Sequence, residues 1–400
     1  MKKFFFYNDP VKTVEESLIL IKENLKEYKE CTSCIMNSSI DGIEFNEEGT
    51  CEFCLGYNSY VEKFHRRNST NTFLETIKKI KTSKNSDGYD CILGISGGVD
   101  SSYLALKCYE WGLNPLLVLF DNGWNTEAAN NNIQAICEKT KFDLYTYVVN
   151  WDEFKDLQLS FLKSGTINFE IPSDHGIFAC LNRTARKKNI KYLLTGVNYS
   201  TETLVSAYKN SLVKYPFGYS YIDLNYILSI HKQYGRIKIK SFPKLSILEK
   251  IFFEKFGFIK KFEPLNYINF NKNDAIKELQ MKTRWRPYQS KHFESIVTRF
   301  FQSYILPVKF NLDKRVLHLS NLIWSKQITK KQANDEMKKK ICEDNILLQD
   351  YYFFLKKLDL TQEEFKNIIF SDNKDFSHYD NSESFINFLK IINNFIKAND

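Results

Sequence analysis

The first half of the chain combines two kinds of hydrophobic pattern. Short continuous apolar runs occupy residues 91–95, 115–120 and 144–149, and longer runs between them carry an apolar residue every three or four positions. Continuous apolar runs are typical of strands buried on both faces, and the longer runs are typical of amphipathic helices. We therefore predict an α/β fold with a parallel, Rossmann-type sheet, whose ligands bind beyond the carboxyl ends of its strands.

Outside this region the pattern is mainly helical. A helical period covers residues 11–30 and another covers about 57–81, whereas aromatic-rich helical runs with basic interruptions follow residue 205. A chain of 400 residues exceeds one ordinary core, so several packed units are expected. We divide it into an N-terminal helix (1–30), a four-cysteine module with a linker helix (31–85), the α/β unit (86–205), a helical substrate or partner region (206–335) and a C-terminal helical subdomain (336–400).

Composition and charge exclude only a few classes of protein and partner. The chain is 43% hydrophobic, and none of its apolar stretches approaches the length needed to span a bilayer. Residues 1–30 lack the apolar core and cleavage site of a secretory signal, so we expect a cytoplasmic protein with no membrane partner. The formal charge of +8 is spread along the chain and does not distinguish nucleic acid from phosphorylated small molecules as a partner.

Four of the nine cysteines form a metal-binding pattern. Cys31 and Cys34 make one C-x₂-C pair, and Cys51 and Cys54 make a second pair after a gap of 16 residues. This spacing brings four thiolates around a tetrahedral Zn²⁺, and disulfides are not expected in the cytoplasm. Because four thiolates leave no coordination position for water, the predicted zinc site is structural.

The segment from Ser96 to Ser102 is the strongest candidate for chemistry. It reads Ser-Gly-Gly-Val-Asp-Ser-Ser and joins the apolar run at 91–95 to a helical run. A strand that turns through two glycines into a helix presents backbone N–H groups to an anion, which predicts a phosphate-binding loop. The lysine of the common nucleotide loop is absent at its usual offset. Asp100 is placed to reach a Mg²⁺ ion bound to the phosphates.

Residues that follow the other strands are expected at the same edge of the sheet. Asp121 ends the run at 115–120, and Gly196 and Asn198 follow a short run at 192–194. Glu202 lies just beyond and has two interpretations, a carboxylate that coordinates Mg²⁺ or orients an amine, and a solvated loop residue. His175 precedes a helical run, where it either donates to a phosphate or substrate oxygen or has a structural role.

A polar segment near residue 290 adds further candidates. Lys291, His292 and Glu294 lie together, and Arg299 follows. Cations placed there can neutralise the charge that develops on a transferring phosphoryl group, and a solvated helix face is the alternative.

The phosphate-binding loop resembles that of the PP-loop ATP pyrophosphatase superfamily, whose members cleave ATP between the α and β phosphates. The four-cysteine module, this loop, the Asp174-His175-Gly176-Ile177-Phe178 segment and the Lys291-His292-Phe293-Glu294-Ser295 segment together resemble the N-acetyl sugar amidotransferase family. So does the continuation Thr298-Arg299-Phe300-Phe301-Gln302, Ile305-Leu306-Pro307, Lys309-Phe310, Asp313-Lys314-Arg315, His318-Leu319-Ser320 and Ile323. These enzymes act in lipopolysaccharide O-antigen and nonulosonic acid biosynthesis.

The resemblance implies a reaction and its partners. ATP would adenylate the acetamido oxygen of an N-acetyl sugar, and ammonia would displace AMP to leave an acetamidino group. Ammonia would come from a separate glutaminase subunit with a cyclase-like, ammonia-channelling partner. The implied cofactors are ATP, Mg²⁺ and Zn²⁺. The catalytic candidates are Asp100, His175, Glu202, Lys291, His292 and Glu294, and the nucleotide-binding candidates are Gly94, Ser96, Gly97, Gly98, Asp100, Ser101, Ser102, Asp121, Gly196 and Asn198.

The chain departs from the family at two positions. Family members usually carry a glycine where Lys326 stands, and many carry a lysine where Val99 stands. Two other functions remain open. A tRNA sulfurtransferase also joins a cysteine-rich module to a PP-loop. Such enzymes often use a C-x₂-C pair near the ATP site, and no further C-x₂-C pair follows Cys54. A catalytically idle scaffold that binds nucleotide and docks the ammonia-producing partners is the third interpretation.

Overall fold

A computed structural model describes residues 9–23, 29–40, 42–67, 69–202, 214–215, 218–288 and 293–388 of the chain. Its centre is a five-stranded parallel sheet in the order β3-β2-β1-β4-β7. The strands are β1 (Cys91–Gly94), β2 (Pro115–Asp121), β3 (Leu144–Val148), β4 (Tyr192–Leu194) and β7 (Lys260–Phe262). The predicted α/β fold with a parallel sheet is therefore confirmed.

Adjacent residues of the sheet face two different cores. In β1, Ile92 packs in a core shared with α6 (Trp151–Ser164) and α7 (Ile171–Lys187). Its neighbour Leu93 packs instead in a core shared with α3 (Thr70–Lys81), α4 (Val99–Glu110) and α5 (Glu127–Thr140). Since successive side chains of a strand point to opposite faces, each face of the sheet is covered by helices, as its continuous apolar strands require.

The parallel register brings the ends of three strands to one edge of the sheet. Leu93 of β1 pairs with Leu117 of β2 on one side and with Leu194 of β4 on the other. The loops that leave β1, β2 and β4 therefore emerge next to one another. This is the edge at which ligands bind in open α/β sheets.

The linker helix expected over residues 57–81 is two helices. α2 (Glu52–Arg67) begins one residue after Cys51, and Ser69 begins α3 by accepting a hydrogen bond from the Thr72 N–H at 3.2 Å. A serine at this position satisfies N–H groups that a continuous helix would have bonded internally, so it favours a new helix start.

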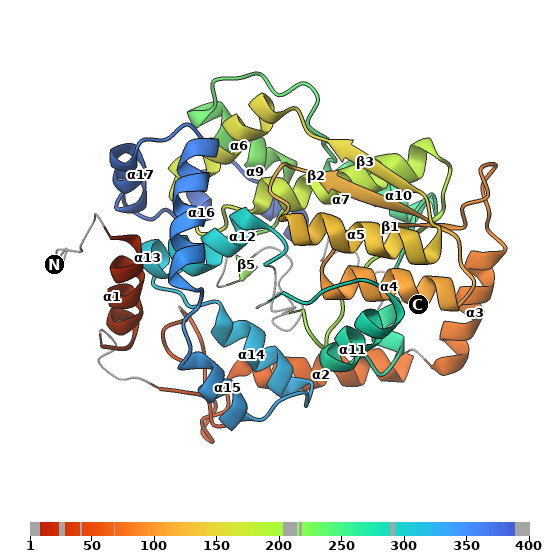
Figure 1. Ribbon diagram of the computed structural model, residues 1–400, viewed down its shortest axis with the longest axis horizontal. Coiled ribbons are helices and arrows are strands. Elements are labelled where there is room, and N and C mark those ends of the chain that lie inside the picture. Colours follow the sequence, from red (N-terminus) through yellow and green to blue (C-terminus); the bar gives the residue numbers. More distant parts are fainter. Residues whose placement is uncertain are drawn as a thin grey trace.

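The remaining elements are mostly helices, and those after residue 296 gather at the end of the molecule opposite α3 (Figure 1). The N-terminal helix α1 (Pro10–Glu23) packs against α13 and α16 of this region. None of the helices in the described ranges is long and apolar enough to cross a membrane. The other elements are β5 (Lys214–Tyr215), β6 (Gly218–Tyr219), α9 (Leu224–Tyr234), α10 (Ile247–Lys255), η1 (Pro264–Tyr267), α11 (Lys272–Lys282), α12 (Ile296–Phe300), the π-helix η2 (Phe301–Ile305), α13 (Leu306–Phe310), α14 (Arg315–Trp324), α15 (Lys330–Met337), α16 (Asp344–Lys357), α17 (Gln362–Ile369) and η3 (Phe376–His378).

Candidate functional site

The phosphate-binding loop lies between the end of β1 and the start of α4. Gly97 has a φ of +80°, and a Cβ atom there would lie 2.5 Å from the carbonyl oxygen of Ala129. A Cβ on Gly98 would lie 2.8 Å from Oε1 of Glu294. Gly97 therefore needs glycine, because its φ is positive and backbone atoms approach closely, whereas a Cβ on Gly98 would displace the Glu294 carboxylate.

The serine hydroxyl groups of the loop form hydrogen bonds with each other and with backbone N–H groups of the loop. Oγ of Ser101 lies 3.2 Å from Oγ of Ser96 and accepts a hydrogen bond from the Ser96 N–H at 3.2 Å. Oγ of Ser96 in turn accepts from the Gly98 N–H at 3.3 Å. The loop thus gathers hydroxyl groups at the amino end of α4, where a helix favours bound anions.

Three side chains from outside the loop donate to the Gly97 carbonyl oxygen. They are Nε1 of Trp285 at 3.0 Å, the hydroxyl of Tyr288 at 3.1 Å and Nδ2 of Asn132 at 3.3 Å. Trp285 is fully buried. Sequence reasoning missed these residues, because it considered only the charged side chains of this segment. The tryptophan and tyrosine beside those charges were the available signal.

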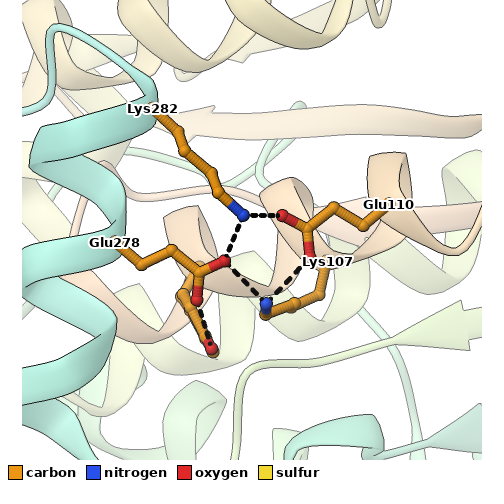
Figure 2. A network of polar contacts seen from close by, with 5 residues as sticks. Lys107, Glu110, Glu278 and Lys282 are labelled. Carbon is orange, nitrogen blue, oxygen red and sulfur yellow. Dashed lines mark hydrogen bonds and ion pairs between the residues drawn. The ribbon is translucent and has the colours of Figure 1, made fainter.

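An ion-pair network fixes the helix that leads into this segment. Figure 2 shows Lys107 and Glu110 of α4 facing Glu278 and Lys282 of α11. Lys107 Nζ lies 2.8 Å from carboxylate oxygens of both Glu110 and Glu278. Burial opposes ionisation of Glu278, but hydrogen bonds from Lys107, Lys282 and Tyr103 outweigh it and lower its pKa to about 2. The network holds α11, and with it Trp285, against the helix that begins at the loop.

Asp100 is oriented by the loop that follows β4. Its Oδ1 accepts hydrogen bonds from Oγ1 of Thr201 at 3.0 Å and from Nδ2 of Asn198 at 3.2 Å. Asn198 is fully buried, and a Cβ on Gly196 would lie 3.0 Å from the backbone carbon of Asp100. The structure thus brings Asp100, Gly196 and Asn198 together, as the strand order led us to expect. Thr201 was not among the sequence candidates.

Asp121 holds the turn at the end of β2. Its Oδ1 accepts from the Gly123 N–H at 2.9 Å. The ammonium group of Lys357, from α16, contacts the Gly123 carbonyl oxygen and lies 4.6 Å from the Trp124 ring centre. Burial lowers the pKa of Lys357, while the charge of Asp121 opposes that shift. The C-terminal helices therefore reach this edge of the sheet.

His175 is a buried residue whose two ring nitrogens both contact backbone. Nδ1 lies 2.7 Å from the Tyr221 carbonyl oxygen, and Nε2 accepts from the Leu245 N–H at 3.2 Å. This pattern requires the neutral ring with its proton on Nδ1, and burial lowers the pKa to about 4. The geometry favours a positioning role over the catalytic role suggested by the sequence.

The neighbouring residue Asp174 belongs to a group of carboxylates. Burial is the largest cause that raises its pKa to about 7, followed by the charges of Glu170 and Glu202. Lys314 opposes this shift, and its Nζ lies 3.9 Å from Glu170. Thr298 also donates to Glu170, at 2.5 Å. The structure therefore groups Glu202, a sequence candidate, with Asp174. Sequence reasoning did not select Asp174 and selected its neighbour His175 instead.

The polar segment near residue 290 is described only in part. Lys291 and His292 lie outside the described residues. Glu294 is described, and its carbonyl oxygen accepts from the N–H of Thr126 at 2.9 Å and from its Oγ1 at 3.1 Å. The Glu294 carboxylate lies beside Gly98, so this candidate is placed at the phosphate-binding loop.

A cavity of about 670 Å³ lies beside Thr201. Thr201 and Phe293 line it on the side of the loop, and His318 of α14 and Gln332 of α15 line it from the C-terminal region. Its volume is within the range of pockets for small molecules. Because the Thr201 hydroxyl also donates to Asp100, Thr201 links the wall of the cavity to the start of α4.

The four cysteines of the N-terminal module form one compact group. Their Sγ atoms all lie within 4.8 Å of one another, and the Cys31–Cys54, Cys34–Cys51 and Cys51–Cys54 pairs are 3.7, 3.7 and 3.6 Å apart. A tetrahedral ion with metal–sulfur bonds of about 2.3 Å has sulfur–sulfur edges of about 3.8 Å. A four-iron cluster binds each thiolate on a different iron and spreads the sulfurs further apart. The group fits a single metal ion.

Comparison with known proteins adds a family for the end of the chain. Residues 294–393 match the family described as LPS biosynthesis protein WbpG-like, C-terminal domain. This part of the chain is thus similar to a domain of lipopolysaccharide (LPS) biosynthesis proteins. This supports the resemblance to the N-acetyl sugar amidotransferases of LPS biosynthesis. The matched residues include α12–α17, and so supply Glu294 and one wall of the cavity.

The other comparisons add little. No curated protein matches the chain. Among solved structures, the U34-tRNA thiolase NcsA from Methanococcus maripaludis, determined with its [4Fe-4S] cluster, is similar at 17% sequence identity and a TM-score of 0.31. The alignment covers 78% of this chain and 88% of that one. A likeness of this degree does not bear on the substrate or the metal of this protein.

Proposed function

We propose that the protein is an ATP-dependent amidotransferase that acts on an N-acetyl sugar. The acetamido oxygen attacks the α phosphorus of ATP and pyrophosphate leaves. Ammonia then attacks the activated carbon, and AMP leaves with the former amide oxygen. The products are an acetamidino sugar, AMP and pyrophosphate, so atoms balance without an oxidant or reductant. Adenylation is needed because an amide oxygen is by itself a poor leaving group.

The observation that carries the proposal is the phosphate-binding loop opening beside the cavity. Ser96, Ser101 and the backbone N–H groups at the start of α4 are placed to hold phosphate oxygens. Mg²⁺ would be held through Asp100, whose carboxylate the Thr201 and Asn198 side chains orient, and would neutralise phosphate charge. Phosphates bound here lie next to the cavity wall that Thr201 forms.

The cavity is the proposed site of the sugar. Its polar lining from His318 and Gln332 suits hydroxyl groups, and Phe293 offers an apolar face near the loop. The WbpG-like C-terminal domain supplies much of this lining. We place the acetamido group of the sugar near Thr201, because Thr201 lines the cavity and also donates to Asp100.

The carboxylate group at Asp174 and Glu202 is the proposed destination of ammonia. Carboxylates attract ammonium, accept its proton and stabilise the cationic amidine that forms. The ammonia itself is proposed to come from a glutaminase subunit through a cyclase-like partner. Burial raises the pKa of Cys180 and of Cys342 to about 11, so neither offers the thiolate that a glutaminase nucleophile requires.

Zinc is the proposed metal of the four-cysteine group. Four thiolates around one ion are typical of structural Zn²⁺ sites and leave no position for a reacting water. We therefore propose that this ion stabilises the module and takes no part in the reaction. One zinc per chain in the purified protein supports this assignment, whereas iron with labile sulfide contradicts it.

Exchange of labelled pyrophosphate into ATP tests the proposed function. Exchange that depends on an N-acetyl sugar, with no ammonia present, is the expected result, because adenylation precedes amination. AMP release that depends on tRNA would instead indicate a sulfurtransferase. The absence of exchange with any acceptor would indicate a scaffold. Asp100→Asn is the matched variant, and it should reduce exchange while leaving the fold intact.

A further inference from the structure

The four-cysteine group is linked by direct contacts to α14 of the WbpG-like domain. Trp324, the last residue of α14, donates from its indole Nε1 to Sγ of Cys54 at 3.0 Å. Tyr57, one turn beyond Cys54 on α2, has its ring centre 5.7 Å from that of Trp324. An N–H group that donates to a metal-bound sulfur stabilises the charge on that sulfur and fixes its orientation.

The same helix holds the loop that follows β4. Nδ2 of Asn321, which is fully buried, donates to the Tyr199 carbonyl oxygen at 3.0 Å. Oγ of Ser325, the residue after Trp324, lies 2.8 Å from the Ser200 carbonyl oxygen, which also accepts from Nε2 of Gln327 at 3.2 Å. Two consecutive carbonyl groups of the loop are therefore fixed by residues on either side of Trp324.

The same loop also orients Asp100 at the proposed nucleotide site. Thr201, the next residue, donates to Asp100 from its hydroxyl at 3.0 Å. The position of the Asp100 carboxylate therefore depends on the loop after β4, and the position of this loop depends on α14. The last residue of α14 is in turn hydrogen-bonded to Cys54, a predicted metal ligand. Hydrogen bonds between described residues join these segments, and Asn321 and Thr201 are both buried.

We propose that the metal-loaded cysteine module positions Asp100 through α14, with Trp324 as the positioning residue between them. The module then does more than hold its own short segment together. Metal bound by Cys54 favours the arrangement of α14 in which Asp100 is set for Mg²⁺ and ATP. By thermodynamic reciprocity, bound Mg²⁺ and ATP also favour retention of the metal. This coupling does not depend on which acceptor the enzyme adenylates.

Trp324→Phe in the full-length chain tests the link to the metal. Phenylalanine keeps an aromatic ring beside Tyr57 and removes only the N–H donor. In protein loaded with Co²⁺, we expect the thiolate-to-metal absorption band to shift and metal loss to a chelator to become about tenfold faster, the usual scale for a hydrogen bond to a charged group. The dissociation constant for ATP with Mg²⁺, measured without acceptor, should rise several-fold. Trp111→Phe is the matched control and should change neither, because Trp111 packs on Phe73 at the far end of α4.

Ser325→Ala tests the link to the loop without touching the sulfur. ATP with Mg²⁺ should bind several-fold more weakly, while metal loss without ATP should keep its wild-type rate. Saturating ATP with Mg²⁺ should slow metal loss from wild-type protein and do so less in either variant. The proposal is overturned if Trp324→Phe loses metal faster yet binds ATP normally, or if ATP leaves wild-type metal loss unchanged. These measurements contain no sugar or ammonia, so failure of amidination does not affect them.

Discussion

The hydroxyl of Thr201 donates a hydrogen bond to Oδ1 of Asp100 at 3.0 Å, although 101 positions separate the two residues in the chain. This bond joins the loop after β4 to the phosphate-binding loop after β1. Strands β1 and β4 are neighbours in the sheet, so the bond spans adjacent strand ends. It also connects the phosphate-binding loop to the cavity, because Thr201 lines the cavity.

Thr201→Val should therefore weaken binding of ATP with Mg²⁺. Valine keeps the shape of threonine and removes only the hydroxyl that orients Asp100. Loss of one hydrogen bond to a charged group corresponds to about tenfold in affinity. Calorimetric titration with ATP and Mg²⁺ measures this effect. Thr140→Val is the control, because its hydroxyl at the end of α5 donates to the Ile136 carbonyl oxygen and accepts from the Phe142 N–H, away from Asp100. Equal affinities of Thr201→Val and wild type would contradict the role given to Thr201.

Gly97→Ala should abolish nucleotide binding. The added Cβ meets the Ala129 carbonyl oxygen at 2.5 Å, in a backbone conformation that L residues rarely adopt. The loop must move to relieve this contact, and Ser96 and Gly98 move with it. Gly257→Ala is the matched control, since Gly257 also has a positive φ but nothing lies within 4 Å of its added Cβ. Gly257→Ala should lower only the free energy of unfolding, by about 1 kcal/mol, because an alanine is strained in this backbone conformation. A Gly97→Ala protein that binds ATP normally would exclude this loop as the phosphate site.

Asp174→Asn should change the pH dependence of stability. The pKa of Asp174 is raised to about 7 in the folded chain, so the folded state binds a proton more tightly than the unfolded state. Stability from this group is fully present below the unfolded pKa and is lost as pH rises through 7. Asparagine mimics the protonated form, so the variant should match wild type at low pH and melt about 2 °C higher at pH 8. Thermal melting from pH 5 to pH 8 checks this, and parallel curves would refute it.

His175→Phe should lower stability without producing a catalytic pH signature. The substitution leaves the Tyr221 carbonyl and the Leu245 N–H without their partner, at a cost of about 1–3 kcal/mol for each buried group. Because the pKa of His175 is lowered to about 4, the ring stays neutral between pH 5 and pH 8. Urea unfolding measures the loss. A wild-type pH–rate profile with a limb near pH 6.5 that disappears in a foldable His175→Gln variant would restore the catalytic role.

Lys326→Gly should stabilise the protein. Lys326 follows the end of α14 with a φ of +58°, in the left-handed region that favours glycine. This conformation costs a lysine about 1 kcal/mol relative to glycine. The structure thus gives a physical reason for the glycine that is usual at this position in the N-acetyl sugar amidotransferase family. A midpoint of urea unfolding that does not rise in Lys326→Gly would contradict this reason.

Hydrophobic pattern and glycine spacing were enough to predict the sheet and the phosphate-binding loop. Both depend on neighbours in the sequence: apolar runs make strands, and two glycines between a strand and a helix leave N–H groups available to an anion. The cysteine spacing likewise predicted a group that the structure shows within a few ångströms.

The residues that sequence reasoning missed are those brought in by tertiary packing. Trp285 and Asn132 reach Gly97 from distant segments, and Thr201 reaches Asp100 from the end of the neighbouring strand. In the Asp174-His175 pair, sequence alone favoured the histidine because imidazole titrates near neutral pH. Burial reverses that preference, since it lowers the pKa of His175 and raises that of Asp174. No local sequence pattern indicates that the side chains at this position are buried.

The mass of the sugar product tests the central claim most directly. Purified protein is incubated with ATP, Mg²⁺, ammonium and candidate N-acetyl sugars, including nucleotide-linked ones and N-acetylated nonulosonic acids. The account predicts a product in which one oxygen is replaced by NH, formed together with AMP and pyrophosphate and absent with Asp100→Asn. A sugar that keeps its acetamido oxygen while ATP is converted to AMP, or sulfur incorporated into tRNA in its place, would contradict it.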